Sequence, residues 1–335
     1  MTVALFTLGG TIAMAGAGTE QSGPGADQPG GTVVARLTGA DLTAAVPGLD
    51  IPLDVHDTRA VPSADLTFRQ LLDLVEQASR AVRAGARGVV VTQGTDTLEE
   101  SAFLVDLVWP HPEPFVLTGA MRNPTLAGPD GPANLLAAAR VAAADEARDL
   151  GALVVLNDEI HAARSVRKAH ATSTAAFTSP DTGPLGHVIE GVPRVLTRPP
   201  RCTPLTPGPG APARVALHTV TLDDDGHALT RLGDGDGVRG LVVAGFGVGH
   251  VPGELAPVLG GLAERMPVVL ASRTGGGSVL RHTYGARGSE TDLQRRGLIN
   301  AGLLDPYKAR VLLRLLLTTE GATTKDIAEE FARHA

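Results

Sequence analysis

The chain has 335 residues, enough for two domains, and its 43% hydrophobic content suffices for two buried cores. A formal net charge of −7 provides no basic stripe for a nucleic-acid partner, and the single cysteine, Cys202, excludes an internal disulfide framework. No apolar run approaches the length of a membrane span, and the chain opens on a strand pattern instead of a signal peptide. We therefore expect a cytoplasmic protein without a membrane partner.

In chain order, short apolar runs alternate with helical patterns, as in α/β proteins with a parallel sheet. Strands are predicted at 2–8, 88–91, 114–117 and 152–156, and helices at 71–84, 97–108 and 133–147. Because successive strands are joined through helices, we predict a doubly wound, mostly parallel sheet. It would form an N-terminal α/β domain over residues 1–195.

Residues 196–213 are rich in proline and glycine, and proline fixes φ and removes hydrogen-bond donors, so we predict a linker there. The alternating pattern then returns. Strands are predicted near 214–220, 240–244 and 267–271, and helices at 254–264, 306–317 and 324–333. Residues 214–335 are therefore expected to form a smaller C-terminal α/β domain.

An insertion follows the first predicted strand. Residues 14–32 are rich in Gly, Ser and Pro and show no hydrophobic period. A disordered surface loop and a lid over an active site are equal alternatives, because active-site lids are among the few reasons for such loops.

The stretch Thr92–Glu100 sets an alcohol and a carboxylate side by side between a predicted strand and a predicted helix. Thr97 and Glu100 have the spacing of a capping box, so the helix is expected to open there. Thr95 and Asp96 would lie in the turn at the carboxyl end of the strand. Open α/β sheets bind ligands at that edge, and a helix N-terminus favours developing negative charge.

A second turn of this kind lies near the start of the chain, where Gly9 and Gly10 lead the first strand into Thr11. Alone, such a turn is more often a tight bend with an incidental hydroxyl. Two strand-end threonines in one domain favour a site, but an alcohol is a poor nucleophile unless a base lies beside it. Lys168 is the candidate base, although composition alone would make it a solvated surface charge.

Several segments occur in a fixed order along the chain. They are Leu8–Ala13, Gly94–Glu100, Leu117–Arg122, Arg164–His170 and Asp305–Arg310. Together they resemble the bacterial asparaginase and glutaminase family of amidohydrolases, and the resemblance runs through nearly the whole chain. It implies hydrolysis of the side-chain amide of L-asparagine through a threonine acyl-enzyme, with glutamine a weaker substrate and no cofactor.

Carried over position by position, the resemblance implies that Thr11 is the nucleophile. It implies that Thr95, Asp96 and Lys168 form a second hydrogen-bonded triad. To act as a base Lys168 must lose its proton, which burial favours and the adjacent Asp96 opposes. We expect Thr11 to be acylated, and Thr95 with neutral Lys168 to activate the hydrolytic water.

The resemblance also implies a substrate-binding set, in which Ser63 holds the α-carboxylate and Asp96 the α-ammonium. The set is Gly10, Ser63, Ala64, Gly94, Thr95, Asp96, Ala120, His250 and Glu290. His250 and Glu290 lie in the second predicted domain, and in the family such groups reach the site of a neighbouring subunit. We therefore expect a homo-oligomer, a dimer or a tetramer with shared active sites.

The chain departs from the family pattern at three places. Ala64 stands where glutamine is common, which removes a hydrogen-bonding partner for the substrate's α-substituents. His250 stands where asparagine is frequent. Residues 14–32 contain no tyrosine, although the family usually supplies one there to close over the nucleophile.

Two other functions stay open. The missing tyrosine and Ala64 leave room for a non-catalytic amino-acid-binding protein on the same fold. The glycine turn at 275–277 suggests a nucleotide-binding module, but it lacks the Gly-Lys-Ser or Gly-Lys-Thr of a P-loop. His161 and His170 lie near Lys168 without the spacing of metal ligands, so no metal is expected.

Overall fold

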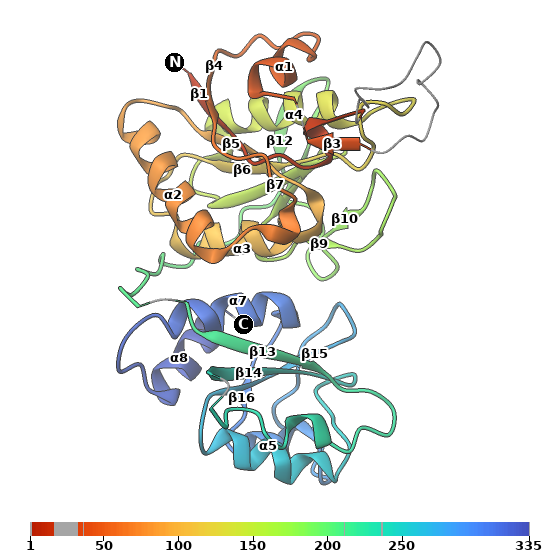
Figure 1. Cartoon of the computed structure of the whole chain (residues 1–335), viewed down its shortest axis with the longest axis vertical. Coiled ribbons are helices and arrows are strands. Elements are labelled where there is room, and N and C mark those ends of the chain that lie inside the picture. The colour runs from red at the N-terminus through yellow and green to blue at the C-terminus, as the bar shows by residue number, and fades with distance from the viewer. Residues whose placement is uncertain (1, 17–32, 36, 211, 236, 335) are drawn as a thin grey trace, which may run out of the picture. The chain divides into compact units, whose positions relative to one another are not determined.

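The computed structural model of the chain is shown in Figure 1, and it describes residues 2–16, 33–35, 37–210, 212–235 and 237–334. Most of the insertion predicted as a loop or a lid, residues 17–32, lies outside the described residues. The chain divides into two compact units, residues 1–204 and 205–335, and each unit has its own sheet. The division falls within the segment predicted as a linker.

The first unit is built on an eight-stranded sheet in the order β12-β11-β8-β7-β6-β5-β1-β4. Its parallel part consists of β4 (Leu53–Asp57), β1 (Val3–Thr7), β5 (Val89–Thr92), β6 (Phe115–Thr118) and β7 (Ala152–Leu156). The antiparallel edge consists of β8 (Glu159–Ala162), β11 (Gly186–Ile189) and β12 (Val192–Val195). The predicted doubly wound, mostly parallel sheet is confirmed, and the antiparallel edge is an addition to it.

Helices cover both faces of this sheet. They are α1 (Gly39–Ala44), α2 (Phe68–Arg83), α3 (Leu98–Val108) and α4 (Gly131–Ala143). Figure 1 shows α1 and α4 on one face and α2 and α3 on the other. Because both faces are covered, β1, β5, β6 and β7 are buried along their whole length, which explains their continuous apolar runs.

The start of α3 differs from the prediction, and the expected capping box of Thr97 and Glu100 is wrong. The Thr97 side chain makes no capping hydrogen bond. Instead its hydroxyl donates to the carbonyl oxygen of Ser63 at 2.9 Å, and Thr95–Thr97 form a 3-10 turn before the helix. Similarly, α4 ends at Ala143, earlier than predicted, because Ala144 is extended.

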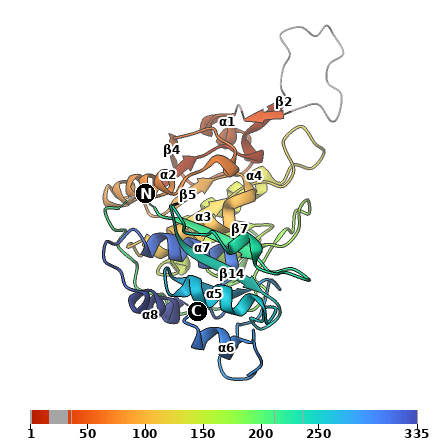
Figure 2. The same cartoon turned by 60° about the horizontal axis from the view of Figure 1, so that its bottom comes forward.

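The second unit has a four-stranded parallel sheet in the order β13-β14-β15-β16. The strands are β13 (Arg214–Thr219), β14 (Val238–Gly245), β15 (Val268–Ser272) and β16 (Ile299–Asn300). The helices are α5 (Leu255–Ala263), α6 (Glu290–Arg295), α7 (Pro306–Leu316) and α8 (Thr324–His334). The helices α5 and α6 pack against each other (Figure 2). The smaller α/β unit is thus confirmed, while β16 and α6 were not predicted.

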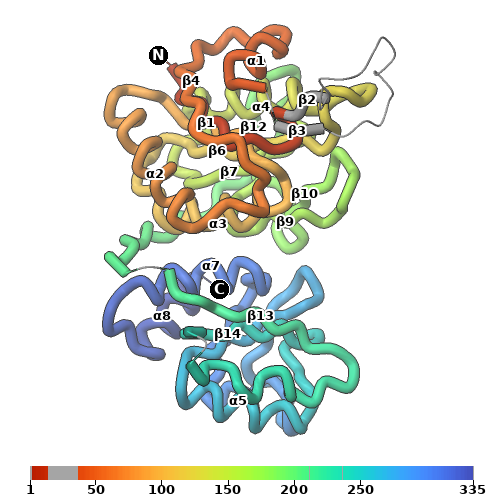
Figure 3. The backbone as a smooth tube through the Cα atoms, viewed as in Figure 1, coloured from red at the N-terminus to blue at the C-terminus, as the bar shows by residue number. Residues whose placement is uncertain are grey.

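Short two-stranded sheets complete the first unit. They pair β2 (Met14–Gly16) with β3 (Val33–Ala35), and β9 (Arg167–Lys168) with β10 (Phe177–Thr178). Figure 3 traces the β9–β10 hairpin, which carries Lys168 and lies outside the eight-stranded sheet. Among the helices that the structure describes, none is long and apolar enough to cross a membrane.

Candidate active site

The turns that follow β1 and β5 touch each other. These strands are parallel neighbours, with Thr7 paired to Thr92, so the turns that follow them leave the sheet at the same edge. Gly10 has φ of +90°, and a Cβ added there would lie 2.2 Å from the backbone nitrogen of Gly94. Only glycine permits this approach, which brings the turns that carry Thr11 and Thr95 together.

A third turn brings Ser63 to the same place. A Cβ added to Gly94 would lie 2.8 Å from Ser63 Oγ, and the Thr97 hydroxyl is bonded to the Ser63 carbonyl. Ser63 is only 3% exposed, yet its hydroxyl has no hydrogen-bond partner among the described residues. The buried oxygens Thr92 Oγ1 and Gln93 Oε1 share this feature. Because buried polar groups are normally paired, these atoms indicate a place for a polar ligand.

The turn after β6 closes this edge of the site. A Cβ added to Gly119 would lie 2.5 Å from the carbonyl oxygen of Gln93, so this turn packs directly on the end of β5. Ala120 is buried, and the carboxylate of Asp130 accepts hydrogen bonds from the next two backbone N–H groups. Ala64, by contrast, is exposed beside Ser63.

The predicted triad is present as a set of contacts. Lys168 Nζ lies 2.9 Å from Thr95 Oγ1 and 2.8 Å from Asp96 Oδ1. The side chain of Lys168 is 15% exposed and that of Asp96 is 74% exposed, while Thr95 is buried. The amine is therefore withdrawn from water on one side and faces a solvated carboxylate on the other. This geometry allows a proton to pass between the Thr95 hydroxyl and Lys168.

Glu99 holds Lys168 in place, and sequence reasoning did not single it out. Glu99 lies in the first turn of α3, is 8% exposed, and accepts a hydrogen bond from the backbone N–H of Lys168 at 2.9 Å. A buried carboxylate on a largely apolar helix is the signal that could have identified it, because such a group needs a partner.

Thr11 begins a 3-10 turn, Thr11–Ala13, directly after the Gly10 bend. Thr11 is partly exposed, whereas Ile12 and Ala13 are buried and anchor the turn in the core. The structure thus gathers most of the expected site residues of the first unit at the carboxyl ends of β1, β5 and β6. They are Gly10, Thr11, Ser63, Gly94, Thr95, Asp96, Ala120 and Lys168.

In the second unit, His250 and Glu290 are hydrogen-bonded, with His250 Nε2 3.2 Å from Glu290 Oε2. Glu290 is fully buried, and its other oxygen accepts hydrogen bonds from the N–H groups of Thr283 and Tyr284. Burial acts to raise the pKa of Glu290, but these N–H groups and the His250 ring stabilise the anion and hold that pKa below its ordinary value. The Tyr284 ring packs edge-on against His250.

Comparison with known proteins identifies the family. A family model described as Asparaginase, N-terminal matches residues 2–201, and the Glutaminase/Asparaginase C-terminal domain matches residues 214–331. The chain belongs to the asparaginase family. Its enzyme class is therefore that of the asparaginase-type amidohydrolases.

Named relatives of this asparaginase-family chain cover nearly its whole length. It is 37% identical to the probable L-asparaginase of Deinococcus radiodurans, over 91% of this chain and 95% of the relative. It is 33% identical to the glutaminase-asparaginase of Acinetobacter glutaminasificans, over 94% and 95%. Its structure matches the probable cytoplasmic L-asparaginase of Campylobacter jejuni with a TM-score of 0.85 at 30% identity, over 99% of both chains.

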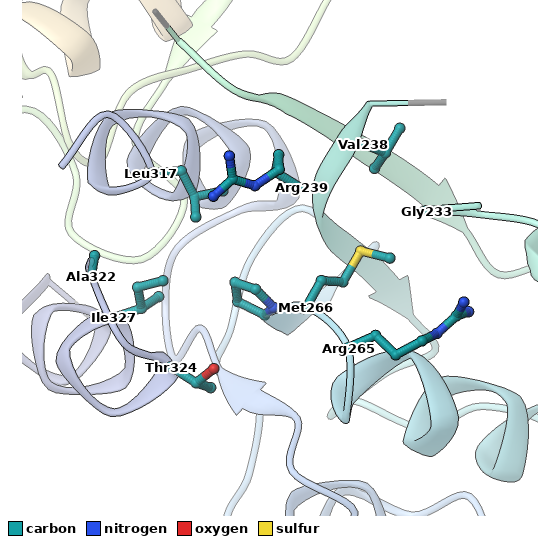
Figure 4. A pocket seen from close by; sticks show the side chains of 10 residues that line it. Gly233, Val238, Arg239, Arg265, Met266, Leu317, Ala322, Thr324 and Ile327 are labelled. Atoms are coloured by element: carbon teal, nitrogen blue, oxygen red, sulfur yellow. The ribbon is translucent and has the colours of Figure 1, made fainter. Parts of the chain in front are cut away.

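A cavity elsewhere in this asparaginase-family chain lies away from the family motifs. It has a volume of about 330 Å³ and is lined by Arg239, Met266, Leu317 and Ile327, among others (Figure 4). It opens at the amino-terminal ends of β14 and β15, whereas His250 follows the carboxyl end of β14. No group of three or more His, Cys, Asp or Glu side chains that could hold a metal ion occurs in the part of the chain that the structure describes.

The contact between the two turns predicts a large cost for Gly10→Ala. The added methyl group meets backbone at 2.2 Å and the residue has φ of +90°, so we expect a loss of about 3–5 kcal/mol in the free energy of unfolding. The matched control is Gly48→Ala, where φ is +72° but no atom lies within 4 Å. It should cost only about 1–2 kcal/mol. Urea unfolding followed by circular dichroism measures both, and equal costs would contradict the close contact.

Proposed function

We propose that this chain hydrolyses the side-chain amide of L-asparagine to aspartate and ammonia, with L-glutamine a weaker substrate. The observation that carries the proposal is the Lys168 Nζ contact with Thr95 Oγ1 at 2.9 Å, at a strand edge where no described residue is hydrogen-bonded to the Ser63 hydroxyl. The names of the relatives, L-asparaginase and glutaminase-asparaginase, support the same substrates.

The proposed reaction begins with acylation of Thr11. Its Oγ attacks the side-chain carbonyl carbon, and its proton passes to the amide nitrogen. The C–N bond then breaks, ammonia leaves, and an aspartyl ester remains on Thr11. The Gly10 bend supports this role, because it presents the Thr11 turn beside Gly94.

Hydrolysis of the ester is the proposed task of Thr95 and Lys168. A water molecule loses a proton to neutral Lys168 through the Thr95 hydroxyl and adds to the ester carbon. The ester C–O bond then breaks, and the Thr11 oxygen regains a proton.

Substrate binding follows from the unpaired polar groups. We assign the α-carboxylate to the Ser63 hydroxyl and the α-ammonium to Asp96, which is mostly exposed. Ala64 offers no side-chain hydrogen bond, so a raised KM for asparagine is expected. The imidazole of His250 is bulkier than the amide usual at this position, which restricts room for the longer glutamine.

We also propose a cytoplasmic homo-oligomer, in which His250 and Glu290 of one subunit serve the site of another. The location is supported by the name of the Campylobacter jejuni protein. The contact of the partly exposed His250 with the buried Glu290 supports the assembly, because it presents a polar group outside the unit that carries Thr11. A fully active monomer in sedimentation at assay concentration would contradict the shared site.

A panel of free amides tests the activity directly. Ammonia release should be measured with L-asparagine, L-glutamine and their D-forms as substrates. We expect L-asparagine to give the highest kcat/KM, with L-glutamine clearly lower. Binding of L-asparagine without ammonia release would instead identify a non-catalytic amino-acid-binding protein, the second candidate that Ala64 favours.

The proposed reaction needs Thr11, Thr95 and Lys168 in one cycle, so loss of any one of them should stop turnover. Replacing any one of them by Ala should lower kcat by about a thousandfold or more, because catalytic groups that act as a unit lose most of their effect when one is removed. Lys325→Ala is the control, since that lysine is 84% exposed and should leave kcat unchanged. Near-normal ammonia release by Thr11→Ala would show that the nucleophile is another residue.

The position of the Ser63 hydroxyl predicts that its removal weakens substrate binding without lowering the stability of the protein. Ser63→Ala removes a buried polar atom without a hydrogen-bond partner in the described part of the chain, so the melting temperature should stay equal or rise. The KM for asparagine should rise about ten- to a hundredfold, because a hydrogen bond to a charged group contributes about 1.5–3 kcal/mol. Ser79→Ala, a buried serine of α2, serves as the control. An unchanged KM for Ser63→Ala would refute the assignment.

A further inference from the structure

The hairpin that carries Lys168 is too small to hold its own position. It consists of β9 and β10 with two residues each, in which Phe177 pairs with Lys168. An isolated two-stranded hairpin is marginally stable in water. Yet Lys168 Nζ must stay within hydrogen-bond distance of Thr95 Oγ1, and an error of about 1 Å in such a contact costs about a hundredfold in rate.

A buried histidine ties the far strand of this hairpin to the main sheet. His161 lies on β8, pairs with Val154 of β7, and is 1% exposed. Its Nδ1 lies 3.0 Å from the Oγ of Ser179, the residue that follows β10. Its Nε2 lies 3.1 Å from Oε2 of Glu159, on the same strand. Both ring nitrogens are therefore engaged, and none of these residues takes part in the proposed reaction.

The direction of the hydrogen bonds follows from the partners. A carboxylate only accepts, so Nε2 of His161 carries a hydrogen and donates it to Glu159. Burial lowers the pKa of His161, and the nearby His187 lowers it further. The carboxylate of Glu159 acts to raise that pKa but does not outweigh them. In the neutral ring Nδ1 is an acceptor, and the Ser179 hydroxyl donates to it.

We propose that Glu159, His161 and Ser179 form a positioning network for Lys168. Glu159 fixes the His161 ring, His161 holds Ser179 at the end of β10, and the β10–β9 pairing carries this constraint to Lys168. Glu99 fixes the other side of β9 through the Lys168 N–H, so the lysine is anchored from α3 and from β8. The proposal rests on the proposed function for its rate effect, but not for its effect on the hairpin.

A second catalytic centre is the competing interpretation, because a serine, a histidine and a carboxylate in this order also form hydrolase triads. The arrangement of the contacts decides against it. In the hydrolase triad the serine contacts Nε2 of the histidine and the carboxylate contacts Nδ1, whereas here Ser179 contacts Nδ1 and Glu159 contacts Nε2. The hydrogen bonds therefore serve to hold the chain.

The test uses variants that remove the link or preserve it. His161→Leu and Ser179→Ala break the contact. His161→Gln preserves it, because a glutamine amide can donate to Glu159 and accept from Ser179. His218→Leu is the matched control, since it removes another histidine–carboxylate pair, with Asp224 at 2.7 Å, in the second unit. Each variant is assayed for ammonia release from asparagine, and amide hydrogen exchange is followed in the peptides that contain Ala169, whose N–H is bonded to Ala176.

We expect His161→Leu and Ser179→Ala to lower kcat about ten- to a hundredfold with KM within about twofold, because only the lysine is displaced. The double variant should be no slower than either single variant, and His161→Gln should recover most of the rate. Exchange at Ala169 should accelerate in His161→Leu and not in His218→Leu.

Three outcomes would overturn the proposal: unchanged kcat in His161→Leu, an equal loss of kcat in His218→Leu, or unchanged exchange at Ala169. A wild-type protein without activity on asparagine would instead remove the proposed function. The exchange experiment does not depend on that activity, so it still decides whether His161 anchors the hairpin.

Discussion

The site depends on one contact, the approach of the Gly10 backbone to the Gly94 backbone. Parallel strands end at the same edge of a sheet, but side chains normally keep their turns apart. Here the missing Cβ atoms let the turn after β1 lie directly on the turn after β5, and Ser63 fills the remaining side. Thr11, Thr95 and Ser63 therefore lie on adjoining turns, at an edge where the strands themselves are fully buried.

The proposed base, Lys168, lies on a different kind of element, and this creates a second constraint. Lys168 lies on a two-residue strand outside the sheet, and its position depends on side chains more than on the backbone ladder. Glu99 holds its N–H, Asp96 and Thr95 hold its amine, and His161 holds the opposite strand. Thr95 thus contacts an amine whose position depends on side chains of α3 and β8 as well as on its own hairpin.

Local patterns were sufficient to predict most of the parallel strands, though not β4 or β16, and the turn that carries Thr95 and Asp96, because strand ends and glycines are encoded within a few neighbouring residues. The capping box was predicted wrongly because Thr97 bonds to Ser63, which is distant in the sequence. The roles of Glu99 and His161 could not be predicted for the same reason, because each residue acts on the Lys168 hairpin through a contact with a residue distant in the sequence. Buried charge in an apolar segment signals such a contact but does not name its partner.

We propose that Thr11 carries the acyl group while Thr95 and Lys168 act on water, and mass spectrometry distinguishes these roles. A Lys168→Met variant is denatured after mixing with asparagine and then digested. Thr11 and Thr95 fall in different tryptic peptides, because Arg59 and Arg87 lie between them. We expect an added aspartyl group on the peptide that contains Thr11, since hydrolysis of the ester is slowed. An aspartyl group on the peptide that contains Thr95 would show that Thr11 is not the nucleophile.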